Sequence, residues 1–251
     1  MAWNLFLICA SALAAGAVNS IAGGGTLLTF PSLLTLLSPV AANATSTVAL
    51  LPGSVSSVLG YREELRKTRH HLILLWPPSL VGGIVGSLLL IRMPEQIFAA
   101  AVPWLLITAS ILFLFQPVLL RYIGAHPHGR ADLRTQIAVV FFQLLVGIYG
   151  GYFGAGIGIL MLSSLAFMGI PDIHEMNAVK NVLAVTMNGI SALIFAVAGV
   201  VTWNYAAVMA IAAIVGGYVG ARVSRRLRPE YVRAIVVGIG FLVAAWAFRS
   251  L

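Results

Sequence analysis

The sequence predicts an all-α integral membrane protein built from two inverted-topology repeats, each a broken, re-entrant-like hairpin followed by three transmembrane helices. Three observations predict this fold class: long apolar segments, a duplicated set of motifs, and basic loops whose positions alternate between the halves. The 251 residues are 60% hydrophobic and 9% charged, with a mean hydropathy of +1.00. Apolar runs of about 18 residues or more are typical of membrane-spanning helices, so we expect no soluble domain.

Eight apolar segments account for most of the chain and, with the first and fifth broken, predict about ten helical pieces. A single cysteine, Cys9, leaves neither a disulfide framework nor a cysteine metal site, and we expect no metal and no cofactor. The segments are 3–37, 44–60, 72–91, 96–120, 136–169, 177–201, 205–223 and 231–249.

The duplication consists of motifs that recur in the same order at a nearly constant distance. "GAVNSIAGGGT" from Gly16 aligns with "GIYGGYFGAGI" from Gly147, an offset of 131 residues. "NATSTV" from Asn43 aligns with "NAVKNV" from Asn177, and "VGGIVG" aligns with "VGGYVG", both at 134. We therefore predict an N-terminal transmembrane repeat over 1–125 and a C-terminal repeat over 126–251.

The net charge of +8 is carried by loops between spans, a pattern that orients a membrane chain rather than binding nucleic acid. The loop "YREELRKTRHH" is strongly basic, whereas its counterpart "GVVTWNY" is uncharged. The next pair reverses this, because "IRMPEQ" has one arginine and "ARVSRRLRPE" has four. By the positive-inside rule the repeats are inverted in a cytoplasmic (inner) membrane, with both termini outside.

This topology makes segments 3–37 and 136–169 hairpins, because each begins and ends on one side. The shorter arm of the second hairpin has about 12 residues and reaches about 18 Å, less than the hydrocarbon layer of about 30 Å. Glycines at the turn allow left-handed dihedrals and close approach of a ligand, and restarting helices offer N–H donors to an anion. The predicted binding residues here are Gly23, Gly24, Gly25, Thr26, Gly154, Ala155 and Gly156.

The next helix of each repeat supplies a second set of candidates. One helix follows Ser38 and Pro39, and the other follows Asp172, with Glu175 placed to complete a capping box. Lys180 lies about 12 Å beyond its cap and is a functional candidate by default, although a lysine can also extend its side chain to the interface. The predicted binding residues are Asn43, Ser46, Thr47, Asn177, Lys180 and Asn181.

All seven acidic residues fall in loops or at helix ends. No carboxylate is therefore expected at membrane depth as a proton relay or cation ligand, and the pathway suits an anion. The glycines of "GGIVG" and "GGYVG" are instead expected to allow close helix packing.

With these motifs, the chain resembles the TauE/SafE family of sulfite and organosulfonate exporters. The resemblance rests on "IAGGGTLLTFP", "YFGAGIGILM", "NAVKNVLAVTMNGISALIF" and "GGYVGARVSRRLRPE", and covers essentially the whole chain. It implies transport of small sulfur-containing anions such as sulfite or sulfoacetate.

The leading hypothesis is a secondary transporter whose partners are a small anionic substrate and membrane lipids, with a homodimer left open. A passive anion channel shares every feature, and a non-transporting assembly or sensor subunit is the other alternative. An enzyme is not expected, because neither a G-x-S-x-G elbow nor an H-E-x-x-H zinc pair is present.

Overall fold

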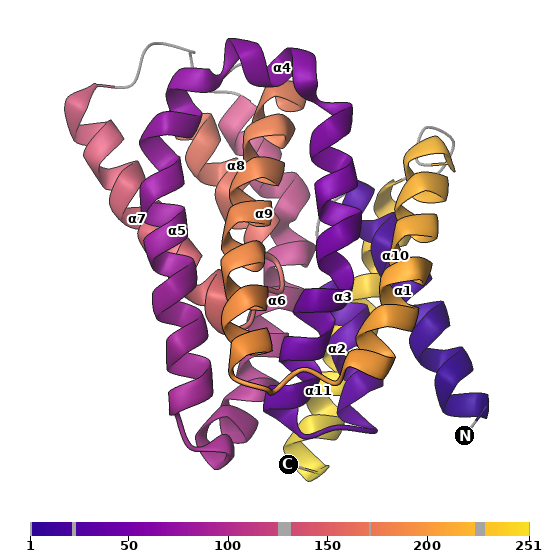
Figure 1. Ribbon diagram of the computed structural model, residues 1–251. Helices are drawn as coiled ribbons and strands as arrows, with labels where there is room; N and C mark the ends of the chain where they lie inside the picture. Colours follow the sequence, from indigo (N-terminus) through magenta and orange to yellow (C-terminus); the bar gives the residue numbers. More distant parts are fainter. Residues whose placement is uncertain (1, 22–23, 125–131, 171, 224–228, 251) are drawn as a thin grey trace.

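The computed structural model describes residues 2–21, 24–124, 132–170, 172–223 and 229–250. These residues form eleven α-helices and no strands (Figure 1). The helices are α1 (Ala2–Ile21), α2 (Thr26–Leu34), α3 (Pro39–Gly60), α4 (Arg62–Lys67), α5 (Arg69–Arg92), α6 (Glu95–Gly124), α7 (Leu133–Tyr152), α8 (Ile157–Phe167), α9 (Ile173–Val197), α10 (Trp203–Val223) and α11 (Pro229–Ser250).

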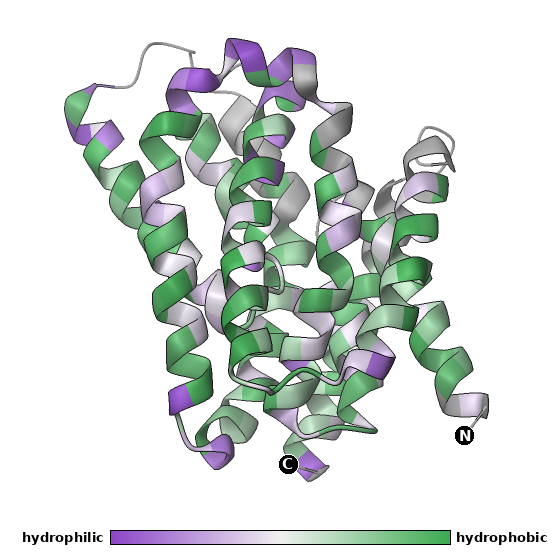
Figure 2. Ribbon diagram, in the orientation of Figure 1, coloured by the Kyte–Doolittle hydropathy of each residue, from purple (hydrophilic) through white to green (hydrophobic). Residues whose placement is uncertain are grey.

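The predicted membrane class is confirmed. Four helices in the described ranges are long and apolar enough to cross a membrane, α5, α7 and α9 along their whole length and α6 over Glu95–Phe115. Large apolar side chains such as Trp3, Trp104 and Leu242 are more than half exposed, as a lipid-facing surface requires. Figure 2 shows hydrophobic residues along the helices and a hydrophilic concentration around α4.

Both predicted hairpins are present and break where the glycines occur. The first passes from α1 to α2 and the second from α7 to α8. Gly24, Gly154 and Gly156 have φ values of 119°, 81° and 79°, which side-chain-bearing residues rarely adopt. In Figure 1, α1 begins at the end of the molecule where both termini lie, whereas α7 begins at the end that holds α4.

The helix caps differ in detail from those predicted. The cap of α2 is Gly25 rather than Thr26, which is the first residue of that helix. Asp172 caps α9 by accepting a hydrogen bond from the N–H of His174, but Glu175 reaches Lys67 at 3.9 Å instead of completing a capping box. Ser38 is the cap residue of α3 without a side-chain cap bond.

Asp132 was not among the predicted caps and begins α7. Its carboxylate accepts a hydrogen bond from the N–H of Thr135 at 3.0 Å. Hydrogen bonds from the side chain and backbone of Thr135 hold the pKa of the Asp132 carboxyl below its usual value. The fifth apolar segment therefore begins with a fixed helix start outside the membrane.

Glycines bring α5 against α7 and α1 against α10, which confirms the packing role expected for "GGIVG" and "GGYVG". A Cβ atom at Gly82 would meet the Leu144 carbonyl oxygen at 2.6 Å, and one at Gly86 would collide with the backbone of Ile148. Similarly, Gly216 lies directly against the carbonyl of Leu13. Only glycine permits backbones this close.

Contacts between a helix of one predicted repeat and a helix of the other occur in corresponding pairs. The pair α5 and α7 has its counterpart in α10 and α1, and the pair α5 and α9 in α10 and α3. Each of the pairs α3–α9 and α6–α11 joins equivalent helices. Helices at corresponding positions of the two predicted repeats thus make corresponding contacts.

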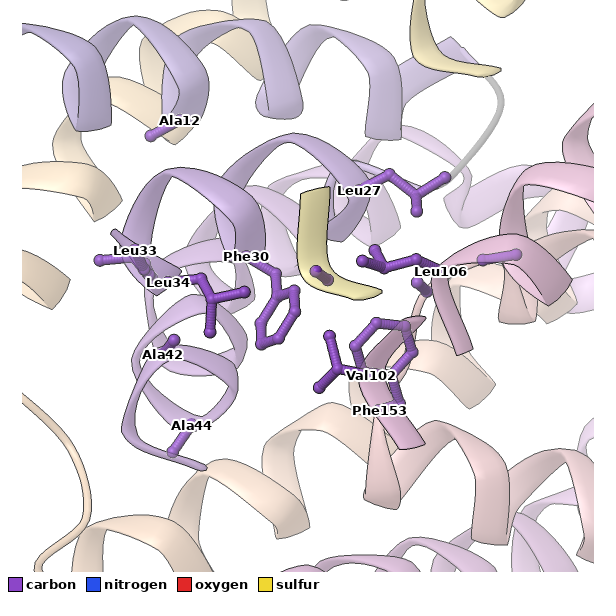
Figure 3. Packing of buried hydrophobic residues seen from close by; sticks show 14 of the residues in the cluster. Ala12, Leu27, Phe30, Leu33, Leu34, Ala42, Ala44, Val102, Leu106 and Phe153 are labelled. Carbon is purple, nitrogen blue, oxygen red and sulfur yellow. The ribbon is translucent and has the colours of Figure 1, made fainter. Parts of the chain in front are cut away.

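The two hairpins meet in the core. Phe30 of α2 packs edge-on against Phe153, at the break between α7 and α8, with ring centroids 5.2 Å apart (Figure 3). The side-chain amide of Asn43 donates to the carbonyl of Tyr152 at 3.0 Å. These contacts hold the end of α7 against α2 and α3, next to the cavity described below.

Candidate anion-binding site

A small cavity lies where the two glycine turns approach α3 and α9. Its volume of about 60 Å³ holds several water molecules, because one needs about 10–15 Å³ on this measure. A cavity this size suits a small oxyanion. The lining residues are Asn19, Gly24, Thr26, Thr47, Leu50, Ser54, Gly154, Ile157, Gly158, Lys180, Asn181, Ala184 and Asn188.

Lys180 provides the only ionisable side chain among these lining residues. It is 5% exposed, and its Nζ donates to the amide oxygen of Asn177 at 2.8 Å. Among the residues that the structure describes, the one ion pair joins Lys67 and Glu175, so no carboxylate neutralises Lys180. A buried cation with a single neutral partner is costly, and an anion in the cavity would offset that cost.

The lining positions on α3 and α9 are equivalent in the two halves. Thr47, Leu50 and Ser54 form a stripe along one face of α3. Asn181, Ala184 and Asn188 form the matching stripe on α9, each 134 residues later. This offset equals that of the duplicated motifs, so the cavity lies between corresponding faces of the two helices.

The glycine turns bring backbone groups to the cavity, but the two turns differ. The N–H groups of Gly24 and Gly25 are already bonded to the side-chain oxygen of Asn19, at 2.8 and 2.7 Å. In contrast, the N–H groups of Ile157 and Gly158, in the first turn of α8, have no hydrogen-bond partner among the described residues. The α8 start therefore offers donors to an anion, as helix N-termini do.

The structure brings together six of the residues predicted to bind substrate: Gly24, Thr26, Thr47, Gly154, Lys180 and Asn181. Asn177 is not part of the lining but contacts Lys180 directly. Gly23 lies outside the described residues.

Five predicted residues lie away from the lining. The hydroxyl of Ser46 contacts that of Thr29 at 2.6 Å, and the amide of Asn43 is directed to Tyr152. Gly25 packs against Ala15. The carbonyl of Ala155 accepts from the Tyr149 hydroxyl, and Gly156 faces Ala109. These residues shape the hairpins rather than the cavity surface.

Asn19, Ser54 and Asn188 also line the cavity and were not predicted from the sequence. Two of them were accessible from helical spacing, because Ser54 lies seven residues after Thr47 and Asn188 seven after Asn181, two turns along the same face. Asn19 lies five residues before Gly24, in "NSIAGGG". An asparagine just before a glycine turn is a usual acceptor for free backbone N–H groups.

The comparison with known sequences decides the family. Residues 8–247 match the protein family described as "Sulfite exporter TauE/SafE". The chain belongs to this family. The TauE/SafE match covers both glycine turns and Lys180, so all the elements of the cavity lie within it.

Curated TauE/SafE relatives are named as membrane transporters. A "Probable membrane transporter protein" of Haemophilus influenzae is 30% identical over 239 residues, covering 91% of this chain and 88% of the relative. "Probable membrane transporter protein YfcA" of Escherichia coli K12 is 27% identical over 241 residues, covering 93% and 86%. "Probable membrane transporter protein YunE" of Bacillus subtilis is 26% identical, covering 91% and 93%. No solved structure matches the chain. The chain is thus a membrane transporter of this family and not an enzyme.

Proposed function

We propose that this protein is a secondary transporter that carries a small sulfur-containing anion, such as sulfite, sulfoacetate or a related organosulfonate, across the cytoplasmic membrane. The observation that carries the proposal is the buried, carboxylate-free environment of Lys180. The anion would bind beside its ammonium group, with the side chains of Asn181, Asn188 and the N-terminus of α8 as neutral donors.

The substrate class is supported by chemistry and family together. When sulfite or a sulfonate is fully ionised, its oxygens accept hydrogen bonds and donate none. Such an anion complements a lining rich in amides, hydroxyls and N–H groups. The family's description names sulfite export. The small volume favours compact anions over long ones.

Alternating access is supported by the reciprocal packing of the halves. We propose that 1–125 and 126–251 are inverted repeats, because equivalent helices make equivalent contacts and the two hairpins begin at opposite ends of the molecule (Figure 1). Repeats of this kind bind substrate near the midplane and rock around it. With the basic α4 on the cytoplasmic side, both termini would lie outside.

Thermal-shift measurement on purified protein tests the substrate. Sulfite, sulfate, thiosulfate, taurine, sulfoacetate and simple carboxylates are compared, since a ligand at about 100 times its Kd stabilises by about 2.7 kcal/mol. Lys180→Met should abolish both the shift and transport while leaving the stability without ligand unchanged or raised. Undiminished transport by Lys180→Met would exclude this site.

Two alternatives give different results in proteoliposomes. A passive channel would give reversal potentials fixed by the anion gradient alone, whereas a coupled transporter responds to the gradient of the coupled ion as well. A non-transporting assembly or sensor subunit would show no anion flux of either kind, passive or coupled, even if it binds an anion.

A further inference from the structure

The residues that line the cavity indicate which group could couple anion transport to a proton gradient. Transporters that couple to protons commonly use an intramembrane carboxylate or histidine as the carrier. Among the residues that line this cavity, Lys180 is the one ionisable group. If a proton crosses together with the anion, the Lys180 amine is therefore the group in the cavity to which it would bind.

No other ionisable side chain shares the cavity lining with Lys180. Its own helix presents Asn177 and Asn181, and the facing helices α2, α3 and α8 contain no titratable residue. On α4 and at the start of α9, Lys67 and Glu175 pair with each other, and Glu63, Glu64, Arg66 and His174 are not among the residues that line the cavity. The remaining titratable groups on the packed helices α1, α5 and α7 lie outside the cavity lining: Cys9, Arg69, His70, His71, Arg92, Arg134, Tyr149 and Tyr152.

The two states of the cavity favour different charges on the amine. When the cavity is empty, an ammonium group would be held by one amide oxygen in an apolar layer, and a neutral amine avoids that cost. When an anion is present, the ammonium form gains a direct ion pair and is favoured. Proton and anion binding are therefore linked, each strengthening the other.

We propose that Lys180 takes up one proton with each anion and releases both on the other side, which makes the protein a proton–anion symporter with Nζ as the proton carrier. The proposal rests on the proposed function. In the bound state the neutral amine has become an ammonium ion paired with the anion, and no bond within the anion changes. A monovalent anion then crosses without net charge, and a dianion carries one net negative charge.

Lys180→Arg separates anion binding from proton release, because guanidinium keeps its proton in proteins. Sulfoacetate serves as the probe, since it is fully ionised near neutral pH. In proteoliposomes at zero clamped potential, a tenfold proton gradient should drive about tenfold accumulation by the parent protein. Lys180→Arg should exchange sulfoacetate across the bilayer more slowly than the parent protein, because the side chain keeps its charge but changes shape, and should lose this net accumulation entirely. Equal accumulation by both proteins would overturn the proposal.

A measurement without ligand tests the same proton independently. If the buried amine is neutral, the unfolded chain binds one more proton than the folded chain, and the free energy of unfolding rises with pH. The melting temperature of the parent protein, relative to Lys180→Met, should therefore rise with pH up to about pH 10, where lysine in the unfolded chain loses its proton. A constant difference would overturn the proposal. Failure of sulfoacetate to bind would instead count against the proposed substrate, and the ligand-free comparison would still decide the proton.

Discussion

The side-chain oxygen of Asn19 accepts a hydrogen bond from the backbone N–H of Gly24 at 2.8 Å, joining the end of α1 to the start of α2 across the break between them. The same oxygen accepts from Gly25 at 2.7 Å. A backbone turn at membrane depth requires such partners, because lipid supplies none. In the first hairpin the protein itself satisfies donors that a bound anion could otherwise have used.

Asn19→Ala should destabilise the protein, because two backbone donors lose their acceptor. The expected loss is about 1–2 kcal/mol, similar to removal of a helix N-cap. Thermal unfolding without ligand measures it. A melting temperature equal to that of the parent protein would mean that water replaces the amide oxygen at this turn.

Asn19→Asp is the matched variant, because it keeps the acceptor and adds a negative charge to a cavity that holds Lys180. Stability without ligand should be kept or raised, and anion-induced stabilisation and transport should be lost, since the carboxylate takes the place of the anion as counter-charge. Retained anion binding in this variant would argue that Asn19 and Lys180 do not share one site.

Gly86→Ala and Gly238→Ala make the same change in two helices with opposite expected effects. A Cβ atom at Gly86 would collide with the backbone of Ile148, so this variant should unfold at a lower temperature or fail to assemble. At Gly238, nothing lies within 4 Å of the added atom, and alanine should leave stability unchanged or raise it by up to about 1 kcal/mol. Equal melting temperatures for the two variants would contradict the close packing of α5 on α7.

Single cysteines test the orientation in the membrane, after Cys9 is replaced. Ser38 and Thr202 line one cavity of about 380 Å³. They belong to the connections α2–α3 and α9–α10, which lie at the end of the molecule opposite α4 (Figure 1). Cysteines at either position should react with an impermeant thiol reagent on intact cells. A cysteine at Arg66, exposed on α4, should react only after the cells are opened. The reverse pattern would place both termini in the cytoplasm.

The hairpins could be predicted from sequence because two independent constraints agreed. Loop charge required segments 3–37 and 136–169 to return to the side where they began, and the glycines marked where the chain could turn. The short α4 was not predicted, since "REELRK" lies in a basic loop and charge pattern alone does not separate a solvated helix from a loop. Its uncharged counterpart "GVVTWNY" forms no separate helix between α9 and α10, and its last three residues begin α10.

The site was predictable in outline but not side chain by side chain. Ser46 and Lys180 occupy equivalent positions, yet they lie one residue off the stripe that faces the cavity. A serine there is too short to reach the cavity and contacts Thr29 on α2 instead, whereas the long lysine side chain extends into it. Spacing gives the direction of a Cβ atom, and the length of the side chain decides where its polar end lies.

The position of Lys180 along α9, where α3 has Ser46 at the corresponding place, gives the two entrances of the protein unequal electrical distances. Lys180 lies eight residues from the Asp172 cap but seventeen from the end of α9, about 12 Å and about 25 Å along the helix axis. An anion approaching from the α4 end would cross the smaller part of the transmembrane voltage drop, and one approaching from the opposite end the larger part. Voltage should therefore change the apparent affinity for the anion more strongly from the side of the termini than from the side of α4.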